Sequence, residues 1–307
     1  MKGKEISITE AVKKFVNDGS TIAFGGFTQN RHPMSFIREM IRQGKKDLVV
    51  YGHSSGIDLD ILVGAGAVKR AEIAYVGDEQ FVTPSPNFGK AAEEGKLEIQ
   101  DYSNYGATLR FLAGAMGLPF MPAKTMLGSD MLKSGSDKGK SEKKFHLMEC
   151  PFTGEKVVLL PAAKPDLAII HAQMVGEGGT VMIYGQKFAD DIIAKAAKEV
   201  VVTAEEILPE EQIRQKPALT CLPFFEVDAI VKSPFGAHPT SCYGLYDYDP
   251  DHYKIYVKAI KSNSFDEYLE RYVYVEHREY FERIGGVEKM ERLRADPVLG
   301  YSPNLKR

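Results

Sequence analysis

The chain has 307 residues, and its 39 Lys and Arg against 42 Asp and Glu give a formal net charge of −3. This near-balance argues against a dedicated nucleic-acid-binding protein, which would carry a basic excess or a basic stripe. With 44% hydrophobic and 26% charged residues, the composition is that of a globular protein, and we expect one α/β domain over residues 1–307.

Short β-branched runs alternate with amphipathic helical patterns in the first half of the chain. Thr9 is predicted to cap a first helix, and residues 20–24 are predicted to form a buried strand. Pro33 suits the first turn of the next helix, which Gly44 closes. The pattern then predicts strands at 47–51, 68–75 and 97–102, and helices at 57–63 and 106–117.

Residues 128–144 interrupt this pattern, because they are rich in Lys, Ser and Gly and almost free of apolar side chains. We expect a mobile surface loop there. Strands are predicted again at 156–160, 167–171, 180–183, 200–203 and 227–231, with a helix at 188–197. Residues 262–307 are expected to form a helical C-terminal extension. The alternation of strands and helices predicts an open α/β fold, with a mostly parallel sheet flanked by helices.

No segment is predicted to cross a membrane or to direct secretion. The longest uncharged apolar run, residues 111–123, holds two prolines and is shorter than the about 20 residues that a spanning helix needs. The first residues show no apolar run after the lysines. Cys150, Cys221 and Cys242 are odd in number and far apart, which suits a reducing compartment. We therefore expect a cytoplasmic protein without membrane attachment.

The strongest local signal for a site is Gly25-Gly26-Phe27-Thr28, which follows the first predicted strand. A Gly-Gly pair lets another chain or a ligand approach the backbone closely. Ligands of open α/β sheets bind at the carboxyl ends of the strands. We expect the backbone at Gly25, Gly26 and Phe27 to receive an anion or oxyanion, and Arg31 to offer a fork for a carboxylate. A tight turn with a surface arginine is the alternative.

A second polar loop, Gly52-His53-Ser54-Ser55-Gly56, follows the next predicted strand, beside the first loop. Its hydroxyl groups and imidazole suit a substrate carboxylate or phosphate, although a simple polar turn would look the same. The loop lacks the GxSxG pattern of a nucleophile elbow, so a hydrolase serine is not expected.

Other motifs do not support a nucleotide or a metal. Gly64-Ala65-Gly66 lacks the third glycine of a dinucleotide fingerprint and follows a helix, and no P-loop pattern is present. His238 and Cys242 are too few for a zinc site. No metal and no permanently bound cofactor are therefore expected.

Residues 18–33 resemble the signature of family I coenzyme A transferases, in which Gly25-Gly26-Phe27 and Pro33 match. Arg31 departs from the pattern, since many short-chain acyl transferases carry glycine there. Within the family, the alpha subunit of the glutaconate branch is most similar. The resemblance covers about residues 5–260 and includes the segments 75–79, 95–98, 117–120, 166–173, 194–206 and 236–249.

This resemblance implies an enzyme that moves coenzyme A between an acyl-CoA and a small dicarboxylic acid such as glutaconate, with the CoA thioester as substrate. In the family, the thioester is attacked by a glutamate of the beta subunit, which then carries the CoA as a glutamyl thioester. The Ser-Glu-Asn-Gly motif that often holds this glutamate is absent, so the catalytic residue is expected in a partner beta subunit. This chain is expected to supply the oxyanion and substrate contacts, from Gly25, Gly26, Phe27, Thr28, Arg31, His53, Ser54, Ser55 and Gly56.

Three glutamates, Glu79, Glu205 and Glu206, are considered as internal nucleophiles, with structural or solvated carboxylates as the alternative. Two other functions stay open. Similar heterodimers act as CoA-thioester decarboxylases or as ring-opening hydrolases, and the hydrolase branch uses an alpha-chain glutamate near the position of Asn104. A non-catalytic subunit that binds a small acid or CoA is the third possibility.

Overall fold

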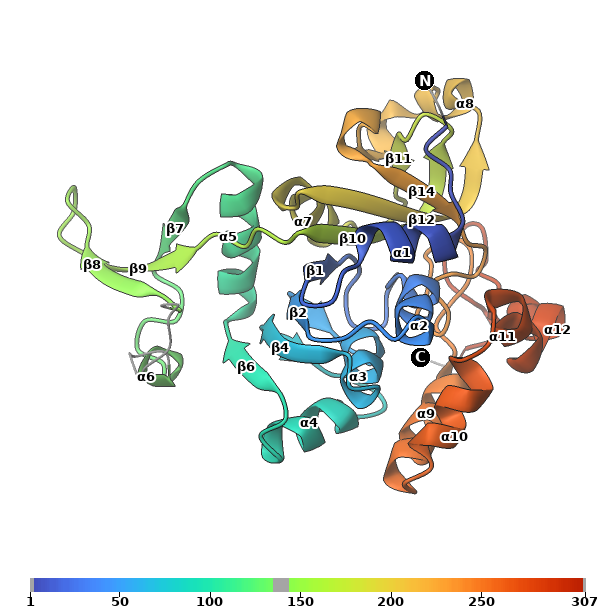
Figure 1. The fold of residues 1–307 in the computed structure, drawn as a ribbon. Coiled ribbons are helices and arrows are strands. Elements are labelled where there is room, and N and C mark those ends of the chain that lie inside the picture. The colour runs from blue at the N-terminus through green and yellow to red at the C-terminus, as the bar shows by residue number, and fades with distance from the viewer. Residues whose placement is uncertain (1–2, 135–143, 306–307) are drawn as a thin grey trace.

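The computed structural model describes residues 3–134 and 144–305, and its centre is a nine-stranded, mostly parallel sheet (Figure 1). The parallel strands run in the spatial order β14 (Ala229–Lys232), β12 (Glu199–Leu208), β10 (Leu167–Gly176), β1 (Thr21–Phe24), β2 (Leu48–Tyr51), β4 (Val68–Ile73) and β6 (Glu98–Asp101). The short strands β11 (Val181–Met182) and β13 (Thr220–Leu222) add antiparallel pairs beside the end of β10. This architecture confirms the predicted fold class.

Side chains alternate between the two faces of the sheet and so divide the core in two. On β1, Ile22 and Phe24 enter one cluster and Ala23 enters the other. The first cluster also holds the buried faces of α1 (Ile8–Phe15), α2 (Met34–Arg42) and α3 (Ile57–Gly64). The second cluster holds residues of α5 (Asn104–Ala115) and α7 (Asp190–Ala196). Helices therefore cover both faces of the sheet.

The C-terminal helices pack into the first core cluster instead of forming a core of their own. They are α9 (Pro250–Lys261), α10 (Phe265–Tyr272), α11 (His277–Arg283) and α12 (Gly286–Leu293). Connecting elements are β3 (Ser54–Ser55), β5 (Tyr75–Val76), α4 (Pro86–Glu93), α8 (Glu210–Arg214), η1 (Pro217–Leu219) and η2 (Phe224–Glu226). Among the described residues, no helix combines the length and the apolar character needed to cross a membrane.

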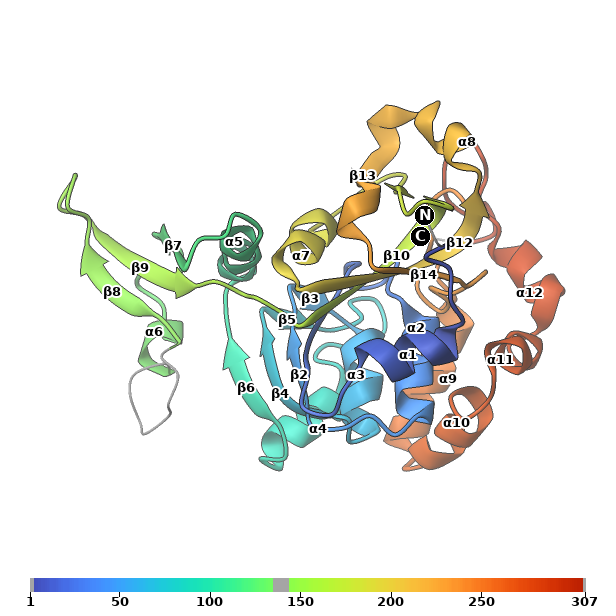
Figure 2. The same cartoon turned by 45° about the horizontal axis from the view of Figure 1, so that its top comes forward.

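A three-stranded antiparallel sheet stands apart from the main sheet, at the left of Figures 1 and 2. It consists of β7 (Phe120–Ala123), β9 (Lys156–Pro161) and β8 (His146–Glu149), in that order, and α6 (Met131–Ser134) lies between β7 and β8 in the chain. We call residues 118–134 and 144–161 the arm.

The sequence predicts a surface loop at 128–144, and the structure departs from this prediction near both ends of the segment. Residues 131–134 form α6, and Lys144 is buried with its ammonium 2.6 Å from Asp101 Oδ1. The ion pair compensates the burial of the charge, which the lysine-rich composition did not reveal. Residues 135–143 lie outside the described residues.

Candidate active site

The predicted site residues lie where the carboxyl ends of the parallel strands meet. The loop 25–31 follows β1, and the loop 52–56 follows β2, the strand that pairs with β1. The amide of Thr28 donates to the carbonyl of Ser54 (3.0 Å), which joins the two loops directly. The structure therefore brings the two predicted groups together.

The backbone amides of the first loop have acceptors within the chain. Gly25 donates to the carbonyl of Ile169 (2.9 Å), and Phe27 donates to the carbonyl of Asn30 (2.9 Å). The amide of Gly26 donates to Asp190 Oδ1 at 3.0 Å. Each of these three N–H groups has an acceptor within the chain, so the oxyanion contact, which stays a prediction, would have to replace one of these hydrogen bonds.

Asp190 explains why glycine stands at position 25. A Cβ atom at Gly25 would lie 2.1 Å from Asp190 Oδ1, so any larger residue would displace the carboxylate. Gly26 has φ = +95°, a conformation that other residues rarely adopt. The Gly-Gly pair thus allows a close approach, as the sequence predicted, but the approaching group is Asp190 from α7.

Arg31 is buried and its guanidinium fork is bound to Asp190. Arg31 Nη2 lies 2.9 Å from Asp190 Oδ2, and Nη1 lies 3.1 Å from Oδ1. The same guanidinium donates to the carbonyls of His171 (2.8 Å) and Gln186 (3.2 Å). Burial disfavours the charged guanidinium, yet the neighbouring Asp190 holds the pKa of Arg31 above its ordinary value. The fork predicted to bind a substrate carboxylate is thus paired inside the chain.

A cavity of about 180 Å³ lies beside this ion pair. Polar side chains of three segments and three aromatic rings line it; the lining residues are Asn30, Arg31, Gly185, Gln186, Phe188, Ser241, Tyr243 and Tyr301. The Phe188 ring stacks on Phe27, with centroids 4.8 Å apart, and so continues the wall toward the second loop. The cavity combines a few polar groups with an apolar wall, as small-molecule sites do.

The second loop supplies an imidazole and two buried hydroxyl groups. The His53 ring lies 5.7 Å from the Phe27 ring, and burial lowers the pKa of His53. Ser54 and Ser55 are buried, and Ser54 Oγ donates to Asn104 Oδ1 at 3.1 Å. Position 104, where the resemblance implies a glutamate in the hydrolase branch, therefore lies against the predicted loop.

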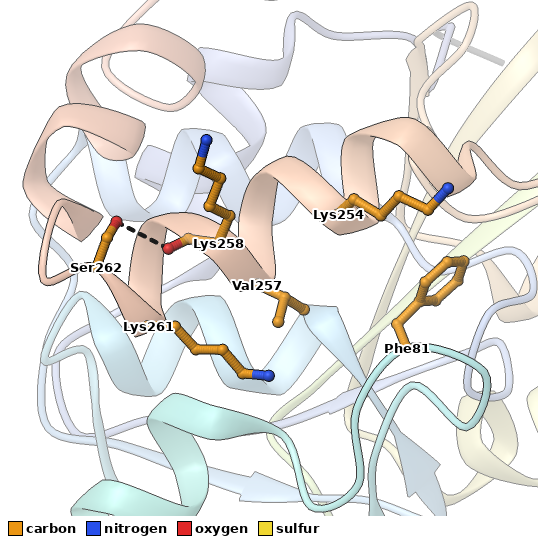
Figure 3. A pocket seen from close by; sticks show the side chains of 6 residues that line it. All are labelled: Phe81, Lys254, Val257, Lys258, Lys261 and Ser262. Carbon is orange, nitrogen blue, oxygen red and sulfur yellow. Dashed lines mark hydrogen bonds between the residues drawn. The ribbon is translucent and has the colours of Figure 1, made fainter.

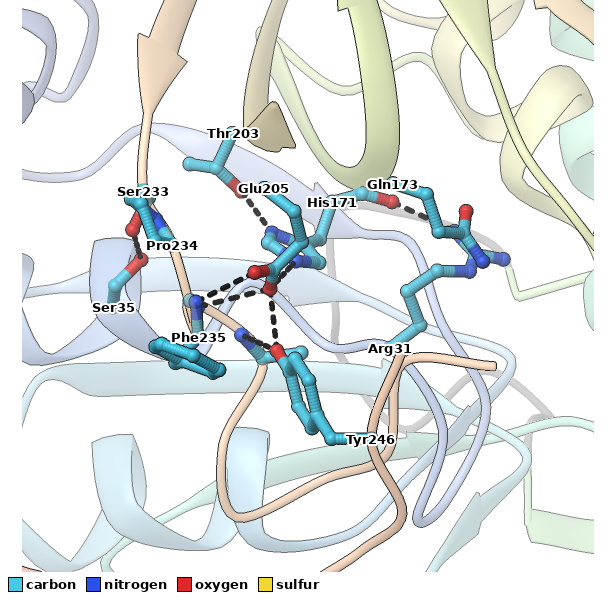
Figure 4. Close-up of polar contacts among 12 residues, drawn as sticks. Arg31, Ser35, His171, Gln173, Thr203, Glu205, Ser233, Pro234, Phe235 and Tyr246 are labelled. Atoms are coloured by element: carbon cyan, nitrogen blue, oxygen red, sulfur yellow. Dashed lines mark hydrogen bonds and ion pairs between the residues drawn. The ribbon is translucent and has the colours of Figure 1, made fainter. Parts of the chain in front are cut away.

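Glu205 lies at the centre of a buried hydrogen-bond network (Figure 4). Its carboxylate accepts from His171 Nε2 (2.9 Å), the Tyr246 hydroxyl (2.5 Å), and the amides of Phe235 (2.6 Å) and Gly236 (3.2 Å). A carboxylate with four donors is a structural group and not a free nucleophile. Glu79 and Glu206, the other two glutamates considered, are exposed.

This network also holds the first loop in place, through the segment that follows residue 235. Glu205 fixes the amides of residues 235 and 236, and the same segment continues to Ser241. Ser241 accepts from the amide of Arg31 (2.7 Å) and donates its own amide to the carbonyl of Gln29 (2.8 Å). No local sequence signal points to this role of Glu205, because its partners lie on β10 and on the segment 235–246.

Three potential metal ligands, His171, Glu205 and Cys242, have donor atoms within 4.8 Å of one another. Both ring nitrogens of His171 are hydrogen-bonded, to Thr203 and to Glu205. Burial raises the pKa of the Cys242 thiol well above its usual range, which keeps the sulfur protonated. His171 and Glu205 therefore belong to the hydrogen-bond network, and the Cys242 sulfur lies beside them.

A larger cavity, of about 390 Å³, lies along α9 and holds none of the predicted site residues (Figure 3). Phe81 and Val257 form its apolar part, and Lys254, Lys258 and Lys261 surround them. These lysines are exposed.

Comparison with known proteins agrees with the resemblance drawn from the motifs. Residues 5–233 match the family described as Coenzyme A transferase. The chain is 40% identical to the alpha (A) subunit of glutaconate CoA-transferase from Acidaminococcus fermentans, over 97% of each chain. The crystal structure of glutaconate coenzyme A-transferase from that organism matches with a TM-score of 0.92, over 97% of this chain and 98% of that chain.

Two further relatives carry other names. A structure of a variant of the decarboxylase AibA/AibB is 33% identical and has a TM-score of 0.78, over 87% of this chain and 98% of that one. The cholesterol ring-cleaving hydrolase IpdA subunit of Rhodococcus jostii is 27% identical, over 85% of this chain and 88% of that protein.

Proposed function

The chain belongs to the coenzyme A transferase family, and from this premise we propose that it is the alpha subunit of a heteromeric enzyme that transfers CoA to and from a small dicarboxylic acid such as glutaconate. The observation that carries the proposal is the 40% identity to the alpha (A) subunit of glutaconate CoA-transferase along almost the whole of both chains. We place the enzyme in the cytoplasm, where a reducing medium suits the three cysteines, which are all free.

In the proposed reaction, the beta subunit supplies a glutamate carboxylate that attacks the thioester carbonyl and expels the CoA thiolate. The thiolate then attacks the glutamyl carbonyl of the resulting anhydride and releases the acid, which leaves a glutamyl-CoA thioester. An incoming acid reverses these two steps and leaves with the CoA. The arrangement of Glu205 supports this division of labour, because its four donors leave it unsuited to the nucleophilic role.

We assign the acid to the cavity beside Arg31. Its volume of about 180 Å³ is smaller than the roughly 300–1,000 Å³ of sites for drug-sized ligands, so it suits a short acid. The second carboxylate of a dicarboxylic acid would lie against Asn30 and Ser241, beside the Arg31–Asp190 pair, and the carbon chain against Phe188 and Tyr243. His53 and Ser54 lie on the adjacent loop, on the side where Phe27 stacks.

The alternative is a decarboxylase or a ring-opening hydrolase with the same fold. The observation that bears on it is the contact between Asn104 and Ser54. Position 104, beside the predicted loop, carries an amide, which cannot act as a general base. This favours transfer over the hydrolytic route.

The test is co-purification with the cognate beta subunit, followed by assays with glutaconyl-CoA or glutaryl-CoA and acetate. We expect acetyl-CoA to form with ping-pong kinetics, and borohydride to trap the thioester on a glutamate of the beta subunit. Release of CO₂ or of free CoA without an acceptor acid, in place of transfer, would overturn the proposal in favour of the alternative.

A further inference from the structure

The arm has an apolar face that the described part of the chain does not cover. Residues in register on neighbouring strands share a face of the sheet. Met121 with Leu160, and Ala123 with Val158, lie on the inner face and pack with α5 in a small core, whereas Leu147, which pairs with Val158 on the same face, is 49% exposed. The inner face is therefore the one that the arm needs to fold.

The opposite, outer face is also apolar. The register places Pro122 and His146 beside Leu159, and Met148 beside Val157. With Phe120, five of these six outer positions are apolar, and Phe120 and Met148 are 42% and 38% exposed. Antiparallel sheets that face water alternate apolar and polar faces, so a sheet that is apolar on both faces is expected to be covered on both.

The base of the arm is attached to the elements that carry the candidate site. The hydroxyl groups of Ser103 and Thr125 lie 2.7 Å apart, and Lys144 pairs with Asp101 at the end of β6. The next residue after Ser103, Asn104, contacts Ser54 of the second loop. A protein that covers the carboxyl edge of the sheet would therefore lie next to the arm.

We propose that the outer face of the arm, formed by Phe120, Pro122, Met148, Val157 and Leu159, is a docking surface for the beta subunit. This inference rests on the proposed function, because the beta subunit is the chain that must reach the carboxyl edge to deliver the glutamate. The arm projects away from the body of its own chain in both views (Figures 1 and 2) and so extends the contact beyond the site.

The reactivity of Cys150 can report whether the outer face of the arm is covered. Cys150 follows β8 at the next outward-facing position, since it comes two residues after Met148. Its side chain is partly exposed, whereas Cys221 and Cys242 are buried. Hydrogen bonding from Thr153 lowers the pKa of the Cys150 thiol, which favours its reaction with a maleimide.

The experiment compares maleimide labelling of Cys150 in the isolated chain and in the complex with the co-expressed cognate beta subunit, read by mass spectrometry. We expect labelling to be at least tenfold slower in the complex. Met148→Glu and Phe120→Glu should each reduce the amount of co-purified beta subunit at least tenfold. Val287→Glu, at a 68% exposed position on α12, is the matched control and should leave it unchanged. Circular dichroism of the isolated variants checks their folding.

The outcomes separate this inference from the proposed function. A complex that transfers CoA while Cys150 reacts at the rate of the isolated chain would overturn the docking surface alone. Protection of Cys150 that grows with the concentration of the isolated chain would assign the face to a second copy and also overturn it. Protection by the beta subunit without any transfer would support the docking surface while the proposed transferase activity fails.

Discussion

At the scale of single residues, Gly25 shows what a sequence pattern can and cannot tell. The Gly-Gly pair at the end of β1 correctly predicted a close approach to the backbone. The approaching group is Asp190, which lies far along the chain and carries no local motif. Local patterns predict that space is needed at a position, whereas the identity of the neighbour depends on the tertiary fold.

Removing Asp190 should destabilise the chain strongly. Asp190→Ala leaves the buried guanidinium of Arg31 without its counter-charge and the amide of Gly26 without its acceptor. Breaking a buried ion pair by removing one partner costs about 3–5 kcal/mol. Urea unfolding of the isolated chain measures the loss, and Asp191→Asn on the same helix is the control. A loss of less than about 1 kcal/mol, well below that range, would show that the pair contributes little.

Arg31 should govern the preference for dicarboxylic acids. In the complex with the beta subunit, Arg31→Ala is expected to reduce the preference for glutaconate over crotonate at least tenfold, which equals about 1.4 kcal/mol. The double variant Arg31→Gln/Asp190→Asn avoids an unpaired buried carboxylate and should show the same loss. The measurement is kcat/KM for both acids. Unchanged selectivity in both variants would contradict the assigned cavity.

At the scale of elements, alternating β and α patterns predicted most of the main sheet, with errors at the boundaries. Thr9 was expected to cap α1, but the cap is Ser7, which forms a capping box with Glu10. The strands of the arm at β7 and β8 were not predicted. β7 (FMPA) contains Pro122 and no polar residue, and β8 is exposed along its whole length, so neither sequence alternates apolar and polar residues as that of a half-buried strand does.

The helix α3 buries a carboxyl group whose titration should shape the pH dependence of stability. Asp60 is fully buried and accepts from the Tyr256 hydroxyl (2.6 Å) and the amide of Phe88 (2.7 Å). Burial raises its pKa to about 6 from the ordinary value of 3.8. The folded state therefore binds more protons than the unfolded state between about pH 4 and pH 6. This contribution to stability is present at low pH and is lost as the pH rises through about 6.

Asp60→Asn should remove this dependence, because its amide stays neutral. Between pH 4 and pH 7, the free energy of unfolding of the variant should rise relative to that of the natural chain by about 3 kcal/mol at most. Urea titrations at several pH values measure the difference, and Asp266→Asn, at an exposed position of α10, is the control. A difference that does not change with pH would contradict a raised pKa of Asp60.

At the scale of the whole molecule, the fold class and the family were predictable from the sequence. Many of the hydrogen bonds and ion pairs inside the site were not. The family match ends at residue 233, yet the core continues into the C-terminal helices. Tyr268, Tyr272 and Tyr280 are buried there around His252. The sequence predicted helices in this region, but a charged amphipathic pattern does not show which core the apolar faces join.

Truncation after residue 262 should therefore disrupt the whole chain. Without α10, α11 and α12, the first core cluster loses buried side chains such as Leu269, Tyr272 and Tyr280. We expect the shortened chain to be insoluble or to unfold without a cooperative transition, as judged by circular dichroism on heating. Removal of residues 304–307 alone is the control. A cooperative transition in the longer truncation would show that the helices are a separable unit.

The two-sided arm also has a consequence for the cell. A sheet that is apolar on both faces leaves its outer face open to water when no other chain covers it, so a surplus copy of this chain exposes an apolar surface that is prone to aggregation. Such orphan copies are the species that chaperones retain and proteases remove. The abundance of this chain would then follow the supply of its partner, and balanced synthesis of the two subunits would be a requirement set by the shape of one small sheet.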